Sequence, residues 1–226
     1  KLLKNQGLQI EYPLNQTCCG QPMANSGCSK DVKKLAIEFV KTFKDFDYIV
    51  APSGSCVSMV KEHYAEFFDN DKDYNKVKAS IYEVCEFFHD IIKIENINFN
   101  VSFPHKVGLH NSCHGHRVLK LATASELNIP YDSKLKNLLN TISDIELVTL
   151  KREDECCGFG GTFSVQEEAI SVAMGKDRIK DHIDSKAEIM TGADMSCLMH
   201  MDGIINRDKN PIKVMHIVEI LAGVKP

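Results

Sequence analysis

The stretch Tyr48-Ile49-Val50-Ala51-Pro52-Ser53-Gly54-Ser55-Cys56 contains, in order, a short apolar run, a turn and a cysteine. The apolar run is rich in β-branched and aromatic residues and ends at a proline, so it predicts a buried strand over 48–52. The serines and the glycine that follow predict a turn into a helix over 57–68. Ile189-Met190 followed by Ser196-Cys197 repeats this order later in the chain. Both cysteines are therefore expected in loops that follow strands.

Strand-like and helix-like segments alternate along the whole chain. Such alternation predicts parallel sheets with helices on both faces, so the expected fold class is α/β. The repeated order around Cys56 and Cys197 predicts two pseudo-symmetric Rossmann-like halves, which we place at residues 1–100 and 101–226. An α/β unit normally opens with a strand, whereas residues 1–7 resemble the end of a helix. We therefore expect the first half to lack its N-terminal strand in this chain.

Hydrophobic spacing predicts the individual elements. Apolar residues three and four positions apart predict amphipathic helices over 31–46 and 80–94. A capping box from Ser164 to Glu167 is predicted to open a helix that ends near Asp184. The other predicted strands cover residues 9–12, 106–110, 146–150, 187–191 and 212–216, and the other predicted helices cover residues 112–127, 134–142, 196–206 and 217–222.

Composition narrows the classes of function. The 226 residues carry a formal net charge of −4, and no basic stripe indicates binding to nucleic acid. No apolar run is long enough to form a transmembrane segment, although peripheral association with a membrane stays open. Nine cysteines without a signal peptide predict a cytoplasmic protein whose cysteines bind metal or act in catalysis.

Two Cys-Cys-Gly tripeptides, at residues 18–20 and 156–158, are the clearest signs of chemistry. Loops that follow parallel strands meet at one edge of a sheet, where such folds bind ligands. Four thiolates at one point suit an iron–sulfur cluster, which we expect to be [4Fe-4S], or zinc. The second half can gather four thiols in this way: Cys113, Cys156, Cys157 and Cys197.

The first half repeats this layout with Cys18, Cys19 and Cys56, since Cys56 follows Cys19 by 37 residues and Cys197 follows Cys157 by 40. The remaining two cysteines are interpreted differently. Cys85 lies on the apolar face of a predicted helix and is expected in the core, because free cysteine behaves mainly as a small hydrophobe. Cys28 is expected not to bind metal.

Histidines gather around the cysteines of the second half. His110, His114 and His116 flank Cys113, and His200 lies three residues after Cys197. They are candidates for donors of hydrogen bonds to cluster sulfur, and the alternative is a set of partly solvated histidines at helix starts. Among them His200 is best placed to bind zinc.

The glycines at 158, 160 and 161 do not form the dinucleotide-binding fingerprint, because position 163 is phenylalanine. A loop that folds tightly around a cluster, with backbone N–H groups directed at sulfur, explains these glycines better. The chain has no recognisable flavin or nicotinamide motif. A cofactor other than metal is therefore not expected.

Five motifs together carry a resemblance to a known family: Cys18-Cys19-Gly20-Gln21-Pro22, Ala51-Pro52-Ser53-Gly54-Ser55-Cys56, His110-Asn111-Ser112-Cys113-His114-Gly115, Glu155-Cys156-Cys157-Gly158-Phe159-Gly160-Gly161-Thr162-Phe163-Ser164 and Ser196-Cys197-Leu198-Met199. Over essentially its whole length the chain resembles the cysteine-rich, Cys-Cys-Gly domain iron–sulfur oxidoreductases. That family includes the cysteine-rich component of heterodisulfide reductase, the glycolate oxidase iron–sulfur subunit and the lactate-utilisation protein A group, which is the most similar.

The resemblance implies a set of ligands. The family pattern in each half is a cysteine, then Cys-Cys-Gly, then Cys-x-x-Cys, and the first half's leading cysteine would lie upstream of Lys1. Ser53 and Asp194 replace the first cysteine of each Cys-x-x-Cys, so five-thiolate ligation is not expected, and Asp194 becomes a candidate neighbour of the site. The implied ligands are Cys113, Cys156, Cys157 and Cys197 in the second half, and Cys18, Cys19 and Cys56 in an incomplete first site.

The resemblance also implies a function. It points to an oxidoreductase subunit that transfers electrons in a multi-protein system oxidising L-lactate to pyruvate. Such a subunit would act only with companion subunits, namely a ferredoxin-like iron–sulfur protein and a small third protein. The alternatives are a heterodisulfide-reductase-like or glycolate-oxidase-like subunit, and a zinc-stabilised scaffold without a redox role.

Overall fold

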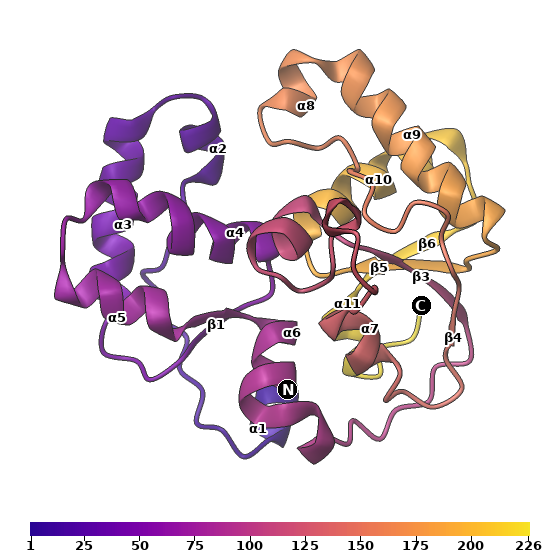
Figure 1. Ribbon diagram of the computed structural model, residues 1–226, viewed down its shortest axis with the longest axis horizontal. Helices are drawn as coiled ribbons and strands as arrows, with labels where there is room; N and C mark the ends of the chain where they lie inside the picture. Colours follow the sequence, from indigo (N-terminus) through magenta and orange to yellow (C-terminus); the bar gives the residue numbers. More distant parts are fainter.

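The computed structural model describes residues 1–226 and contains two parallel sheets. The first is a pair, β1–β2, and the second has four strands in the order β4-β3-β5-β6. Helices flank both sheets, as Figure 1 shows, so the predicted α/β class is confirmed. The strands are β1 (Ile49–Ala51), β2 (Ile81–Glu83), β3 (Lys106–His110), β4 (Glu146–Leu147), β5 (Ile189–Gly192) and β6 (Lys213–His216).

Seventeen helical elements connect and cover these strands. None of them is both long enough and apolar enough to cross a membrane. The α-helices are α1 (Leu2–Asn5), α2 (Gln21–Asn25), α3 (Ser29–Phe43), α4 (Gly54–Ser58), α5 (Lys72–Ser80), α6 (Val84–Glu86), α7 (Lys134–Leu139), α8 (Phe163–Gln166), α9 (Glu168–Asp184), α10 (Met195–Asp208) and α11 (Ile217–Leu221). The π- and 3₁₀-helical turns are η1 (Met59–His63), η2 (Tyr64–Phe67), η3 (Phe87–Lys93), η4 (Ile94–Asn96), η5 (His114–Val118) and η6 (Ser125–Leu127).

The register of the second sheet brings loop residues to one edge. Val107 pairs with Ile189, and His110 at the end of β3 pairs with Gly192 at the end of β5. Gly192 in turn pairs with His216 at the end of β6. Because all four strands are parallel, the loops that follow them leave from the same edge, and the cysteines of the second half lie in those loops or in the first turn of the helix that follows.

One apolar core serves both sheets. A continuous cluster of 32 buried residues includes Val32 and Ala36 of α3 as well as Val107 of β3 and Ile217 of α11. In Figure 1 the indigo and magenta elements lie on one side and the orange and yellow elements on the other, with α4 between them. The predicted helix over 31–46 is confirmed as α3, whose buried face includes Val40.

The two sheets also end in matching local structures. Glu83 ends β2 and caps α6, where Glu86 returns a hydrogen bond to the backbone of Glu83. His216 ends β6 and caps α11, and Glu219 closes the same reciprocal arrangement. These two capping boxes are a local similarity between the ends of the two sheets, and the internal repeat stays a prediction.

The two halves are joined where the helices that carry Cys56 and Cys197 begin. Ser53 precedes α4 and Asp194 precedes α10, and the two residues form an isolated antiparallel bridge. The Gly54 amide donates to the Ala193 carbonyl oxygen at 3.2 Å. The Asp194 carboxylate accepts from the Ser55 amide at 2.7 Å and from the Ser196 amide at 3.1 Å. One buried carboxylate therefore caps its own helix and holds the equivalent loop of the other half.

The predicted helix over 80–94 is wrong at its start. Ile81 to Glu83 form β2, and the helical turns begin only at Val84. The reason is the capping box, because Glu83 uses its side chain to cap the backbone of Cys85 and Glu86. A helix that the sequence analysis did not predict, α5, occupies residues 72–80.

The predicted long helix over 112–127 is also wrong. Only the turns η5 and η6 are helical there, and Lys120 adopts a left-handed φ of 57°. The backbone after this point bonds to residues 132–134 instead: the Thr123 amide donates to Asp132 O, and the Lys134 amide donates to Leu121 O, each at 2.8 Å. Backbone hydrogen bonds between residues 121–123 and 132–134 therefore take the place of the predicted helix.

Two further predictions fail locally. Ser164 does not cap a helix, because its hydroxyl donates to the Gly161 carbonyl oxygen at 2.8 Å. The predicted helix is instead divided into α8 and α9 at Glu167, whose φ is −122°. Residues 9–12 form no strand and run as an extended segment.

Candidate metal centre

The four cysteines predicted for the second half come from three loops. Cys113 follows β3, Cys156 and Cys157 lie between β4 and α8, and Cys197 lies in the first turn of α10. The Cys113 and Cys156 sulfur atoms are 3.3 Å apart. The sulfur atoms of Cys157 and Cys197 and a ring nitrogen of His110 all lie within 4.8 Å of one another.

The electrostatic environment links these thiols into one group. The hydrogen bond from Cys113, a second bond from Cys157 and the Gly158 amide lower the pKa of Cys156, which favours its thiolate. The donors shift in the opposite direction: the contact with Cys156 raises the pKa of Cys113, and contacts with Cys156 and Cys197 raise the pKa of Cys157. Negative charge is therefore concentrated on the Cys156 sulfur. The thiols of Cys113 and Cys157 would lose their protons only if a bound cation compensated the added negative charge. This four-thiol donor set fits an iron–sulfur cluster or zinc.

The Cys-Cys-Gly backbone explains the glycine of the motif. Gly158 has a φ of 85°, a left-handed conformation that directs its N–H at the Cys156 sulfur, 3.4 Å away. A Cβ atom at this position would lie 2.7 Å from the Ser171 carbonyl oxygen. The Ser171 hydroxyl, in α9, donates to the Gly158 carbonyl oxygen at 2.8 Å. Helix α9 thus fixes the shape of the cysteine loop.

A small apolar cluster lies under this site and shields it from water on one side. Cys157 is itself 1% exposed and packs with Leu198, Met201 and Ile204 of α10 and with Met190 of β5. Low local polarity strengthens the electrostatic interactions of the thiols and of any cation they bind.

His110 is the histidine closest to the thiols, and it is buried. Its Nδ1 accepts a hydrogen bond from Nε of Arg178 at 3.2 Å, and its Nε2 is buried without any partner. Burial and the charge of Arg178 lower the pKa of His110 to about 3, so the imidazole is neutral. Arg178, a fully buried arginine of α9, was not predicted as a site residue, and only its place on the inner face of α9 could have indicated it.

The other predicted neighbours lie further out. His114 Nε2 is 3.2 Å from Gln21 Nε2, so this side chain reaches the first half. His116 Nδ1 lies 2.8 Å from the Ser112 carbonyl oxygen. His200 Nε2 lies 3.3 Å from the Ser171 carbonyl oxygen, which can only accept, so that nitrogen carries a proton and is not free to bind zinc.

The carboxylate of Asp194 is used to hold the backbone. Both of its carboxylate oxygens accept backbone N–H groups, from Ser55 and from Ser196, and the side chain is 2% exposed. It therefore caps the helix that presents Cys197. Ser53 does the same for Cys56, whose amide donates to the Ser53 hydroxyl oxygen at 3.4 Å. Both substitutions in the Cys-x-x-Cys pattern are good N-cap residues, and that signal was visible in the sequence.

The cysteines of the first half form a smaller group. The Cys19 and Cys56 sulfur atoms are 3.4 Å apart, and the Gly20 amide points at the Cys18 sulfur, also at 3.4 Å. Gly20 has a φ of 84°, which repeats the conformation of Gly158. The Tyr64 hydroxyl donates to the Cys19 carbonyl oxygen at 2.8 Å. The Cys19 hydrogen bond lowers the pKa of Cys56 to about 7.

The last two cysteines lie apart from both groups. Cys85 is fully buried in the shared core, as predicted. Cys28 is exposed just before α3, and its thiol approaches only the Ser26 carbonyl oxygen, at 4.0 Å. Neither position offers a second thiol.

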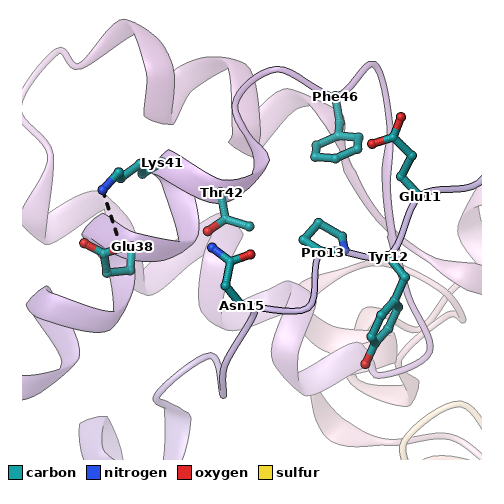
Figure 2. Close-up of a pocket in the computed structure, with 8 residues that line it drawn as sticks. All are labelled: Glu11, Tyr12, Pro13, Asn15, Glu38, Lys41, Thr42 and Phe46. Carbon is teal, nitrogen blue, oxygen red and sulfur yellow. Dashed lines mark ion pairs between the residues drawn. The ribbon is translucent and has the colours of Figure 1, made fainter.

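A polar hollow of about 630 Å³ lies against α3, and Figure 2 shows its lining. Lys41 and Glu38 pair across 4.0 Å on one side, and Tyr12 and Pro13 come from the extended segment on the other. The lining contains no cysteine or histidine. An apolar hollow of about 350 Å³ lies beside it and reaches Cys19 and Cys56 along the free edge of β1.

Comparison with known proteins identifies one family and several similar relatives. A family model described as "Cysteine-rich domain" matches residues 1–61 and 107–202. The chain is 39% identical over 225 residues to "Lactate utilization protein A" of Geobacillus thermodenitrificans, covering 98% of this chain and 89% of that protein. Proteins of the same name from Oceanobacillus iheyensis and an Exiguobacterium species are 37% and 38% identical, over 98% and 100% of this chain and 87% and 89% of their own lengths.

Proposed function

This chain belongs to the cysteine-rich domain family, and from that membership we propose that it is an iron–sulfur electron-transfer subunit of a system that oxidises lactate to pyruvate. The observation that supports the proposal is the two close sulfur pairs of the second half, Cys113–Cys156 and Cys157–Cys197, which the contact between Cys156 and Cys157 joins. Four thiolates are the usual ligands of a [4Fe-4S] cluster. When bound, such a cluster accepts or donates single electrons.

The residues of the chain supply the surroundings for this chemistry. Cys113, Cys156, Cys157 and Cys197 would hold the cluster, and the Gly158 amide donates to the Cys156 sulfur. The apolar cluster around Leu198 excludes water on one side. The hydrogen bond to sulfur and the exclusion of water both favour stable binding of a charged cluster. Neither of them requires a protein side chain to transfer a proton.

The assignment to lactate rests on the relatives, which carry the name "Lactate utilization protein A". Because the chain has no recognisable flavin or nicotinamide motif, we propose that it works with companion subunits. These would be a ferredoxin-like iron–sulfur protein and a small third protein in the cytoplasm. Lactate-driven reduction of the cluster in the presence of these subunits is the expected result.

We also propose that residues 1–100 and 101–226 are two versions of one unit, each with its own cysteine site. The matching capping boxes and the matching φ values of Gly20 and Gly158 support this division. The first unit has two strands where the second has four, and three grouped thiols where the second has four. Its site would therefore bind a cluster more weakly.

Anaerobic measurement of iron, acid-labile sulfide and zinc, with an electron paramagnetic resonance spectrum, tests the proposal. Iron and sulfide in equal amounts are expected. One zinc per chain without sulfide would overturn the redox function and leave the zinc-stabilised scaffold, because the four cysteine thiols also suit zinc. Turnover of a heterodisulfide or of glycolate, without any response to lactate, would overturn the choice of substrate alone.

A further inference from the structure

We infer that Arg178 is a positioning residue that fixes His110 as a hydrogen-bond donor to the second site, and so excludes His110 as a metal ligand. The inference deepens the proposed function, because it concerns the group that the four thiols would hold. It rests on the contacts of one buried arginine and on the hydrogen-bonding chemistry of guanidinium and imidazole.

The Arg178 side chain is held on every side. It is 0% exposed, and its NH1 donates to the Asp181 carboxylate at 3.2 Å and to the Arg152 carbonyl oxygen. Its NH2 donates to the Leu109 carbonyl oxygen at 3.4 Å, and its Nε donates to His110 Nδ1 at 3.2 Å. These bonds leave the guanidinium no freedom to turn away from His110.

The bond to Arg178 decides which nitrogen of His110 carries the proton. A guanidinium group has five N–H donors and no acceptor, and it stays protonated in proteins. His110 Nδ1 must therefore be the acceptor and cannot carry a hydrogen. In a neutral imidazole the proton then lies on Nε2.

That proton has no partner within the chain. His110 Nε2 is buried and makes no hydrogen bond, which is costly unless something binds there. The imidazole lies within 4.8 Å of the Cys157 and Cys197 sulfur atoms. We take these thiolates, or the sulfur of a cluster bound to them, as the acceptors of the Nε2 proton. A protonated nitrogen has no lone pair to give to a metal ion.

The arrangement has a consequence for reduction. A cluster gains negative charge when it accepts an electron, and an N–H donor with a buried guanidinium behind it stabilises that charge. Hydrogen bonds to sulfur are among the factors that set cluster potentials. The Arg178–His110 pair therefore raises the reduction potential of the second site.

Nitrogen-15 NMR of the zinc-loaded, diamagnetic protein tests the protonation of His110 directly. The His110 signals are assigned as those missing from the His110→Gln variant. We expect a protonated Nε2 and a bare Nδ1. A protonated Nδ1 with a metal-bound Nε2 would overturn the inference. This measurement uses the unmodified chain and does not depend on the identity of the native metal.

Redox titration of the iron-loaded protein, followed by electron paramagnetic resonance, tests the effect on potential. Arg178→Met and His110→Leu should each make the reduction equilibrium of the second site about tenfold less favourable, which is about 59 mV for one electron. His110→Gln keeps an N–H donor and should recover most of this shift. Lys180→Met, on the exposed side of α9, is the matched control and should change nothing. Equal shifts in all variants, or none in Arg178→Met, would contradict the inference.

The two failures are distinguishable. Absence of iron and sulfide would remove the proposed function while leaving the NMR result on His110 intact. A normal cluster with an unaltered potential in Arg178→Met and His110→Leu would remove the inference while leaving the proposed function intact. If Arg178→Met does not fold, the NMR measurement still decides.

Discussion

The two Cys-Cys-Gly loops share a backbone conformation and differ in their surroundings. Gly20 and Gly158 have nearly the same φ, and each directs its N–H at the sulfur two residues earlier. A Cβ at Gly158 would meet the Ser171 backbone at 2.7 Å, whereas a Cβ at Gly20 would meet only side-chain atoms, of which the nearest is the end of Leu35 at 3.2 Å. The second loop is held by a long helix, and the first has more room.

The polar groups around the two sites also differ. The second site has a buried histidine backed by a buried arginine, whereas the first has the Tyr64 hydroxyl, which is committed to the Cys19 carbonyl oxygen. The comparison shows one local motif in two different environments, and we therefore expect two sites of unequal strength. The motif sets the shape of the loop, and the neighbouring elements supply the remaining thiol and the buried charged groups.

The largest expected effect comes from removing one thiol of the second site. Cys157→Ser should lose the cluster of that site, about four iron atoms per chain, because three thiolates bind a [4Fe-4S] cluster poorly. Iron analysis and the paramagnetic spectrum would measure the loss. Cys19→Ser should remove less iron, and Cys28→Ser, which changes an exposed thiol outside both groups, should remove none. Equal losses in Cys157→Ser and Cys19→Ser would show that the sites are equivalent.

A second prediction concerns Glu83, the helix cap whose counterpart in the second half is His216. Burial raises the pKa of Glu83 to about 8, against about 4.3 in an unfolded chain, so the folded protein holds a proton that the unfolded chain releases. Stability should therefore fall as the pH rises from about 5 to 8, by up to about 1.4 kcal/mol per pH unit. Denaturant titrations of the wild type and Glu83→Gln at several pH values would measure this difference.

In Glu83→Gln the amide oxygen can still cap α6, so the slope assigned to Glu83 should disappear while the helix remains. Other titrating groups contribute equally to both proteins and cancel in the difference. Parallel curves for the two proteins would contradict the prediction.

The third prediction concerns the junction between the halves. Asp194→Ala removes a helix cap and leaves the buried Ser55 amide without its acceptor, so we expect a loss of about 3 kcal/mol in unfolding free energy. Ser53→Ala removes only a cap and should cost about 1 kcal/mol. Chemical denaturation of the metal-free variants would measure both values. A larger loss for Ser53→Ala would show that Asp194 does not hold the junction.

The smallest effects should come from the hydroxyl groups that hold the cysteine loops. Tyr64→Phe and Ser171→Ala each remove one hydrogen bond to a loop carbonyl, and each should cost about 1 kcal/mol. Tyr64→Phe should release metal more readily from the first site only, and Ser171→Ala from the second only. Chelator titration followed by spectroscopy would measure this, and release from both sites together would contradict independent loops.

Much of the fold was predictable, because it depends on local patterns. The apolar spacing of α3 and the short strand over 106–110 identified these elements correctly. Errors occurred where distant residues decide the local structure, as at Lys120, after which the chain pairs with residues 132–134. The start of β2 was missed because Glu83 caps the next helix with its side chain, which spacing alone does not indicate.

The candidate site was predictable in part. Loop order alone predicted that Cys113, Cys156 and Cys197 would leave the same sheet edge, and the short sulfur distances agree with that placement. That these residues bind metal stays a prediction. Arg178 could not be identified, since a lone arginine among the charged residues of a helix looks solvated until the packing of α9 against β3 is known.

The junction at Ser53 and Asp194 also has a consequence for how the protein is made. The Ser55 amide and the Asp194 carboxylate are 139 positions apart in the sequence, so this contact forms only after Asp194 has left the ribosome. Contacts of such separation form late, because the intervening chain must first be ordered. The turn that presents Cys197 is therefore among the last parts to settle. We therefore expect the proposed cluster to be inserted only after this turn has folded, with Cys197 as the last thiol to close the site.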